Sequence, residues 1–158
     1  VRLSAHAGAC KVKNFRDEGG WCGLGAKFLR EMGQPSVAFW PEKSMDRAND
    51  RPEVWANAAL HKVSEEWIDI ASPVYDQTLS VAQLATCLLS GIPCATDWDE
   101  WGHSVCALRW VKVEGGSYGP KILNSWTDQW GDKGMAIIRA GWTFESAVAL
   151  RVTGAAPA

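Results

Sequence analysis

Two apolar runs rich in β-branched residues, 104–113 and 121–126, constrain the fold more than any other feature of this chain. The link between them, 114–120, contains the glycines and the proline that close antiparallel pairs. The pattern therefore predicts a β-hairpin. His103 precedes the first strand and Asn124 lies near the end of the second, so the asparagine carbonyl can accept the outer imidazole N–H. Such a bond fixes the tautomer and leaves the other ring nitrogen for a nucleophile.

The same stretch carries Gly-His-Ser-Val at the start of the first strand and Asn-Ser-Trp-x-x-x-Trp-Gly-x-x-Gly after the second. These segments resemble the histidine and asparagine segments of papain-like cysteine peptidases. In that family a thiolate lies beside an imidazolium, an asparagine orients the imidazole, and a tryptophan shields the bond between them from water. The resemblance implies these roles for His103, Asn124 and Trp126. The alternative is structural: His103 would be a core histidine with satisfied hydrogen bonds, Asn124 a hydrogen-bonding residue at a strand end, and Trp126 part of the core.

The N-terminal part resembles the same family. Apolar residues at helical spacing predict a helix over 21–32, ended by a glycine. In family order, the matching features are Leu3-Ser4, Cys10, Gly19-Gly20, this helix, Gly33 and Trp40-Pro41. The resemblance implies that Gly19 and Gly20 pair with an extended substrate as an added strand, and that Trp21 and Cys22 lie by the pocket for the second substrate side chain. An ordinary turn before a helix is the alternative reading of the two glycines.

The nucleophile is not identified by this alignment. The family's nucleophile helix precedes the Leu-Ser pair, so we expect this chain to lack that helix and the oxyanion-hole glutamine, and the intact product to be longer at its N-terminus. The family spacing from nucleophile to histidine is roughly 130–150 residues, which neither Cys22 nor Cys10 satisfies. A competing alignment gives Cys22 a helix N-terminus, which would lower its pKa, but puts Gly25 at the nucleophile position. Cys22, Cys10 and an inactive relative remain open.

The rest of the chain predicts alternating helices and strands. Residues 11–18 are expected to be a loop, and Asp97, Asp99 and Glu100 to belong to a solvated acidic loop near the presumed cleft. The further predicted elements are a helix opening at Pro52, a strand over 67–70, a helix over 80–89 capped by Ser80 and ended by Gly91, and strands over 92–96, 135–139 and 147–152.

Together these elements predict an α+β protein with the papain-like fold and without its nucleophile helix. We expect one domain over residues 1–158, with a mainly helical part over 1–65, a β-rich part over 66–153 and a tail over 154–158. The helical layer is expected to pack on an antiparallel sheet or half-barrel, with the cleft between them. A chain without the central helix is expected to expose apolar surface and to be marginally stable.

The expected function is peptide-bond hydrolysis by a Cys-His-Asn mechanism, with a peptide or protein as substrate. The alternatives are a non-catalytic peptide-binding or structural module, and an acyl-transfer enzyme such as a transglutaminase, which usually has an aspartate where Asn124 stands. A net charge of -2 with interspersed signs argues against nucleic acid, and the apolar runs are too short for a membrane span. No spacing of cysteines or histidines suggests a metal site, and no cofactor is expected. Compartment and oligomeric state are not determined by the sequence.

Overall fold

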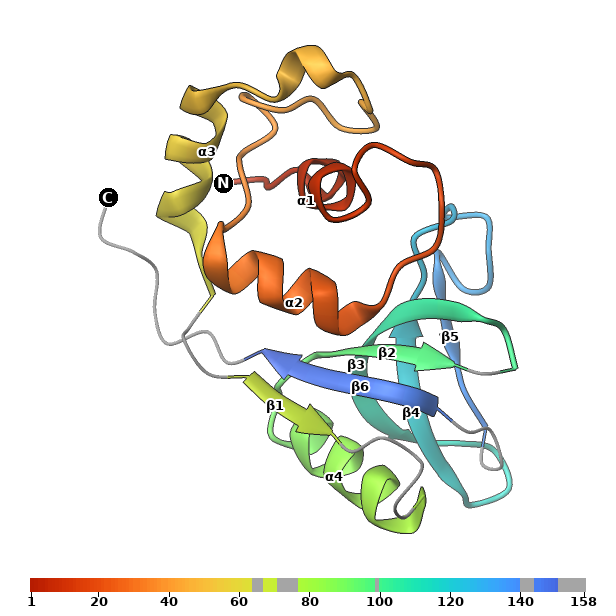
Figure 1. Cartoon of the computed structure of the whole chain (residues 1–158). Coiled ribbons are helices and arrows are strands. Elements are labelled where there is room, and N and C mark those ends of the chain that lie inside the picture. The colour runs from red at the N-terminus through yellow and green to blue at the C-terminus, as the bar shows by residue number, and fades with distance from the viewer. Residues whose placement is uncertain (64–66, 71–76, 99, 140–143, 151–158) are drawn as a thin grey trace. The chain divides into compact units, whose positions relative to one another are not determined.

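The computed structural model describes residues 1–63, 67–70, 77–98, 100–139 and 144–150. Their contacts divide the chain into two compact units, with a helical first unit up to Glu66 and a second unit over Trp67–Leu150. Figure 1 labels the elements of both. The boundary lies next to the one expected between the helical and β-rich parts, and the single-domain organisation stays a prediction. No helix in these described ranges has the length and apolar character needed to cross a bilayer.

The first unit contains three α-helices and two short 3-10 helices among its described residues. They are α1 (Ala5–Val12), α2 (Cys22–Glu31), η1 (Arg47–Asn49), α3 (Pro52–Ala58) and η2 (Ala59–His61). Pro52 occupies the first turn of α3, as predicted, because its missing N–H has no helical partner there. The region expected to be a loop from residue 11 begins later, since α1 continues to Val12.

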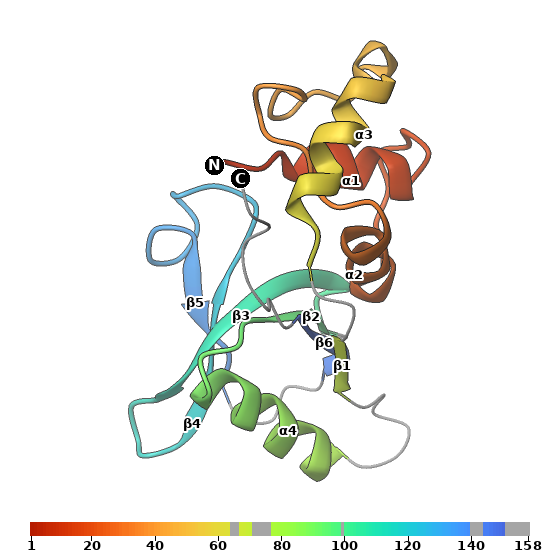
Figure 2. The same ribbon diagram turned by 90° about the vertical axis from the view of Figure 1, so that its left-hand side faces the viewer.

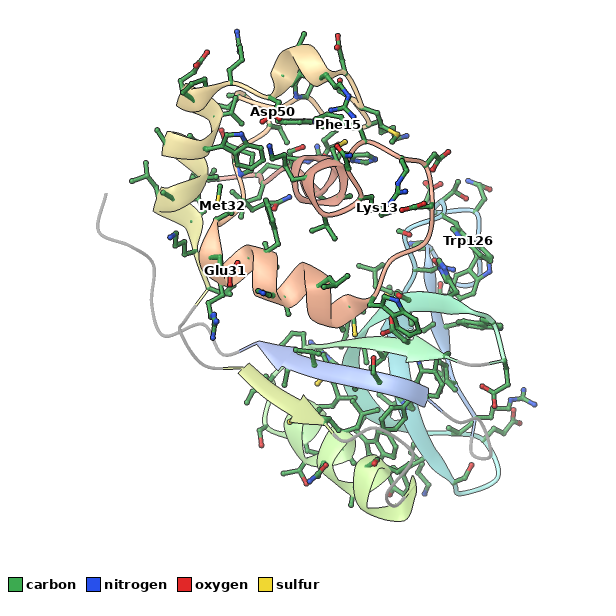
Figure 3. All side chains as sticks on the ribbon, in the orientation of Figure 1. Lys13, Phe15, Glu31, Met32, Asp50 and Trp126 are labelled. Atoms are coloured by element: carbon green, nitrogen blue, oxygen red, sulfur yellow. The ribbon has the colours of Figure 1, made fainter. Side chains whose placement is uncertain are left out.

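The core of the first unit is aromatic. Trp40 is fully buried, and its ring lies 6.0 Å from that of Phe15 and 5.9 Å from that of Trp55. The Trp40 indole N–H donates to the carbonyl of Ser44 at 2.9 Å, so its polar atom is satisfied. At the rim, Asp50 accepts hydrogen bonds from Lys11 and from the Trp55 indole; Phe15 and Asp50 are labelled in Figure 3. Several rings thus hold together helices that are individually short.

Gly33 ends α2, as the sequence predicts. Its φ of +79° is a left-handed conformation that residues with a Cβ rarely adopt. A Cβ built on Gly33 would lie 2.0 Å from the carbonyl oxygen of Ala58, at the end of α3. Both the turn and the close approach of the two backbones therefore require glycine here.

The described residues of the second unit form an antiparallel sheet of six strands in the order β1-β6-β2-β3-β4-β5, together with one helix. The strands are β1 (Trp67–Ile70), β2 (Cys94–Trp98), β3 (His103–Lys112), β4 (Tyr118–Leu123), β5 (Met135–Ile137) and β6 (Phe144–Leu150). The predicted hairpin is present as β3 and β4. The strand expected over 92–96 begins two residues later, directly after Pro93, whose missing N–H suits a position outside the ladder.

Helix α4 (Gln77–Leu89) covers one face of this sheet, as Figures 1 and 2 show from two directions. Leu84 and Leu88 of α4 pack with Ala107 and Ile122 of β3 and β4 in one buried cluster. The predicted cap at Ser80 is wrong: α4 begins at Gln77, and Ser80 lies buried within it. A serine has the residue type of a cap, but Ser80 lies inside the helix with its side chain buried. Gly91, with φ +76°, follows α4 as expected.

Together the two units confirm the α+β class.

All five cysteines carry thiols rather than disulfides, and Cys10 is buried in the first unit with its Sγ 3.7 Å from the carbonyl oxygen of Ser44.

Candidate active site

His103 and Asn124 meet at one end of the β3–β4 hairpin. His103 is the first residue of β3, and Asn124 directly follows β4, where its backbone N–H donates to the carbonyl of Gly134 at 2.8 Å. The imidazole Nε2 lies 2.9 Å from the side-chain oxygen Oδ1 of Asn124. The two residues are separated by twenty-one positions in sequence, and the hairpin brings their side chains into hydrogen-bond contact, as its pattern predicts.

The hydrogen bonds around Asn124 fix the tautomer of His103. The backbone N–H of Ser125 donates to Asn124 Oδ1 at 2.7 Å, and a backbone N–H can only donate, so this atom of the amide is the oxygen. An oxygen that only accepts requires a proton on His103 Nε2. In the neutral ring the other nitrogen, Nδ1, is then an unprotonated base.

Trp126 lies over the imidazole of His103. Its ring centroid is 5.0 Å from that of His103, with 34° between the ring planes. Trp126 packs edge-on against Trp130 at 5.9 Å, and Trp130 packs edge-on against Trp101 at 6.0 Å. The outermost ring is 59% exposed, whereas Trp101 and Trp130 are partly buried against the core of the second unit. A string of three indoles thus connects the core to the cover of the histidine. Figure 3 labels Trp126.

A buried carboxylate lies one strand away from His103. Asp97 of β2 is only 5% exposed, and it accepts hydrogen bonds from the hydroxyls of Ser104, its cross-strand neighbour on β3, and Ser146 on β6. The expectation of a solvated acidic loop is therefore wrong for Asp97, because β2 extends through it to Trp98. Glu100 is exposed, and Asp99 lies outside the described residues.

A shallow hollow of about 270 Å³ opens beside Asn124 on the sheet face opposite α4. Ala95, Cys106 and Leu123 form its apolar part, and Leu123 is 43% exposed. Asn124 is 94% buried, yet its amide nitrogen Nδ2 has no hydrogen-bond partner among the described residues. A buried donor without an acceptor costs about 1–3 kcal/mol. Asn124 Nδ2 is such a donor, and it lies on the residue that binds the histidine.

Cys94 and Cys106 of the second unit do not have the character of a nucleophile. Burial, followed by the neighbouring thiols of Cys87 and Cys106, raises the pKa of Cys94 to about 12. Burial also raises the pKa of Cys106, which lines the hollow beside Asn124. A raised pKa keeps the thiol protonated, and the thiolate is the reactive form. In the first unit, burial raises the pKa of Cys10, and the Lys13 charge opposes the shift in part.

The remaining predicted site residues lie in the first unit. Gly19 and Gly20 are exposed just before α2, and Trp21 is 59% exposed at its N-cap. A Cβ built on Gly19 would meet nothing within 4 Å, so no packing contact in the described structure requires glycine there. Cys22 is the first residue of α2 and is half-buried.

Local sequence patterns do not predict that Asp97 is buried, that Ser146 donates to it, or that Trp101 packs against Trp130. Ser146 and Asp97 are separated by almost fifty positions, and no local pattern connects them, so only the pairing of β2 with β6 brings them together. No group of three or more potential metal ligands occurs among the residues that the structure places.

No protein-family model and no curated protein sequence matches the chain. Solved structures do. The ragweed pollen allergen Amb a 11, a cysteine protease in its proform, matches 99% of this chain with a TM-score of 0.70 at 17% identity. Bromelain from Ananas comosus, in complex with the E64 inhibitor, matches 96% with a TM-score of 0.64 at 16% identity. Xylellain, a cysteine protease from Xylella fastidiosa, matches 96% with a TM-score of 0.63 at 13% identity.

The chain accounts for only part of these proteins. The alignments cover 54% of the Amb a 11 structure, 78% of bromelain and 70% of xylellain, so this chain spans about half the length of the ragweed protein. At such low identity the likeness concerns the course of the backbone. On that ground, and in agreement with the motifs around the hairpin, the chain has the fold of the papain-like cysteine peptidases.

Proposed function

We propose that this chain supplies the histidine and asparagine of a cysteine peptidase site that hydrolyses peptide bonds. The observation that carries the proposal is the hydrogen bond between His103 Nε2 and Asn124 Oδ1, with the Trp126 ring next to the imidazole. In this arrangement the basic nitrogen Nδ1 is available to a thiol, and the asparagine holds the ring in the orientation and tautomer that the reaction needs.

The proposed chemistry follows from that tautomer. His103 Nδ1 takes the proton of the attacking thiol as the sulfur bonds to the substrate carbonyl carbon, and later gives it to the leaving amine. Asn124 accepts from Nε2–H throughout and so stabilises the imidazolium. Trp126 keeps water away from this hydrogen bond, which is stronger in a less polar environment.

The nucleophile remains the open part of the proposal. We infer that it is not Cys94 or Cys106, because burial raises the pKa of each thiol. The chain then carries only part of the catalytic machinery, unless Cys22 acts from the start of α2. By resemblance to the family, Gly19 and Gly20 would pair with the substrate backbone and Trp21 would contact a substrate side chain.

A non-catalytic peptide-binding module is the second candidate function. The raised pKa values of Cys94 and Cys106 favour it, since they keep both of these thiols protonated. Both candidates keep a peptide or protein as the ligand, and they differ in whether a covalent bond forms.

The test is incubation with a peptidyl vinyl sulfone, followed by mass spectrometry of the modified peptide. Labelling of Cys22 that disappears in His103→Ala but persists in His6→Ala would place a complete thiol–histidine pair in this chain. Absence of labelling would leave the binding module or a partial site. The partial site is then tested by ¹⁵N NMR of His103: a proton on Nδ1 rather than Nε2 at neutral pH would contradict the peptidase proposal.

A further inference from the structure

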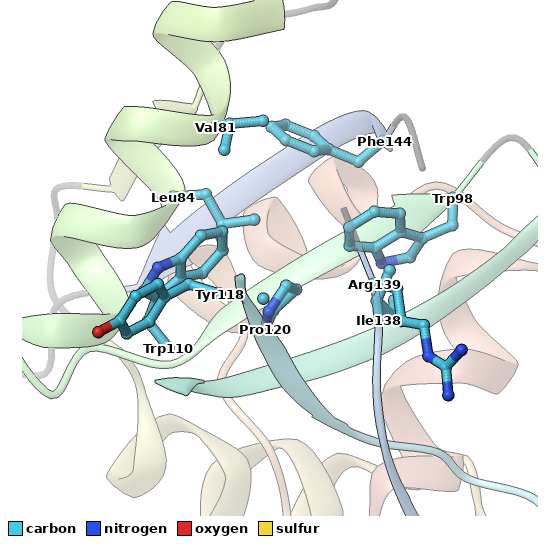
Figure 4. A pocket seen from close by; sticks show the side chains of 10 residues that line it. Val81, Leu84, Trp98, Trp110, Tyr118, Pro120, Ile138, Arg139 and Phe144 are labelled. Carbon is cyan, nitrogen blue, oxygen red and sulfur yellow. The ribbon is translucent and has the colours of Figure 1, made fainter. Parts of the chain in front are cut away.

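The second unit contains an apolar cavity between α4 and the sheet. Its volume is about 140 Å³, and it is shown in Figure 4. Four aromatic side chains, each near the end of a strand, contribute to its lining, together with aliphatic side chains of α4. The principal ones are Trp98, Trp110, Tyr118, Phe144, Val81 and Leu84. None of these residues lines the hollow beside Asn124, so the two sites are distinct.

The described side chains that line the cavity contain no buried polar atom without a hydrogen-bond partner. The indole N–H of Trp98 already donates to the hydroxyl of Thr96 at 2.8 Å. Arg139 also lines the cavity, but Figure 4 shows its guanidinium turned away from the aromatic rings, and the residue is exposed. Among the described residues, the buried side-chain atoms without a partner belong to Ser4, Gln34, His61 and Asn124, none of which lies here. A polar or charged ligand would therefore lose hydration without compensation.

The size and the lining select one class of ligand. An engineered apolar cavity of about 150 Å³ stays dry and binds benzene, so a cavity of about 140 Å³ accommodates a molecule of one ring. The Trp98 and Phe144 rings already pack edge-to-face, with centroids 5.7 Å apart and 66° between their planes. Aromatic pairs in such geometry gain about 0.5–1.5 kcal/mol beyond the burial of area. The surrounding rings offer the same geometry to a further aromatic ring.

We infer that the second unit binds a small, neutral, single-ring aromatic molecule in this cavity. The inference does not depend on the proposed peptidase function, because it uses neither His103 nor any thiol. The ligand binds only the folded protein, so it also stabilises the second unit.

The experiment uses benzene as the probe and the whole chain as the target. Benzene is titrated while ¹H–¹⁵N NMR follows the indole N–H signals of Trp98 and Trp110. We expect saturable shifts in both, no shift in the signal of Trp55 in the first unit, and weaker binding of cyclohexane, whose ring carries no π-system. Val81→Phe, which fills the cavity from α4, is expected to weaken benzene binding at least tenfold. Ala82→Phe adds the same ring to the exposed side of α4 and is expected to leave binding unchanged.

Two results would overturn the inference. One is the absence of a saturable shift in the unaltered protein up to the solubility limit of benzene, which would mean that the cavity is filled or closed. The other is equal binding by the unaltered protein and Val81→Phe. Should Val81→Phe fail to fold, Leu84→Ala replaces it: the enlarged cavity is expected to gain binding of the two-ring probe naphthalene, and no gain would count against the site. Tight binding of cyclohexane would contradict the aromatic class.

Discussion

Replacing Asn124 by alanine separates stability from function at the candidate site. The substitution removes the acceptor of two hydrogen bonds, from His103 Nε2 at 2.9 Å and from the Ser125 backbone at 2.7 Å. Each is worth about 1 kcal/mol of net stability, so their loss costs about 2 kcal/mol. The same substitution removes the amide nitrogen that is buried without a partner, which relieves about 1–3 kcal/mol. The two effects nearly cancel, and the free energy of unfolding is expected to change by less than about 1 kcal/mol.

The tautomer of His103 is expected to change even though the stability does not. Losing a bond of about 1 kcal/mol to Nε2–H lowers the ratio of the Nε2–H to the Nδ1–H form about fivefold, since 1.4 kcal/mol corresponds to a factor of ten. Urea denaturation measures the free energy of unfolding, and ¹⁵N chemical shifts of the imidazole measure the tautomer ratio of His103.

Asn57→Ala is the matched control. The Asn57 Oδ1 also accepts a backbone N–H, from Ser36 at 2.8 Å, but its amide nitrogen is not among the buried atoms without a partner. We expect this control to lose about 1 kcal/mol, with no effect on His103. The reasoning is refuted if Asn124→Ala costs more than about 2 kcal/mol, because Nδ2 must then have a partner, or if the tautomer ratio stays unchanged.

Three further predictions concern the cover of the histidine, a buried thiol and a turn. Trp126→Ala is expected to speed the exchange of the His103 imidazole N–H with water about twofold to twelvefold, as measured by NMR, because a ring contact of about 0.5–1.5 kcal/mol is lost; an unchanged rate would argue against shielding. The pKa of Cys94 is raised from 9.0 to about 12, so the folded state keeps a proton that the unfolded state releases. Stability is therefore full below about pH 9 and falls by about 1 kcal/mol per pH unit between about pH 9 and about pH 12, a slope that Cys94→Ala should reduce in urea titrations. Gly33→Ala should destabilise by more than about 2 kcal/mol, because of its positive φ and the backbone contact, whereas Gly25→Ala within α2 should stabilise by about 0.5–1 kcal/mol; equal effects in thermal unfolding would contradict both.

Much of the fold follows from local patterns in the chain. Alternation and turn chemistry predict the hairpin of β3 and β4, helical spacing predicts α2, and Pro52 and Gly33 mark where helices begin and end. The predictions that are wrong concern where helices and strands begin or end, as at the start of α4 and at both ends of β2. The start of α4 was missed because Ser80 has the chemistry of a cap but lies buried in the helix, a matter that packing decides.

The contact between His103 and Asn124 was predictable because a hairpin is local: one turn fixes the register, and the register fixes which side chains meet. The hydrogen bond from Ser146 to Asp97 was not, since it depends on β6, a strand that comes from a distant part of the sequence and pairs with β2.

The sequence by itself determined the class of fold, the hairpin and the pairing of a histidine with an asparagine, because each depends on residues that are neighbours along the chain or across one turn. Only the tertiary structure decided which acidic side chain is buried, which thiols hold their protons and where a cavity remains. Burial, and with it the pKa of a thiol or the space left between side chains, is a property of packing between segments far apart in the sequence.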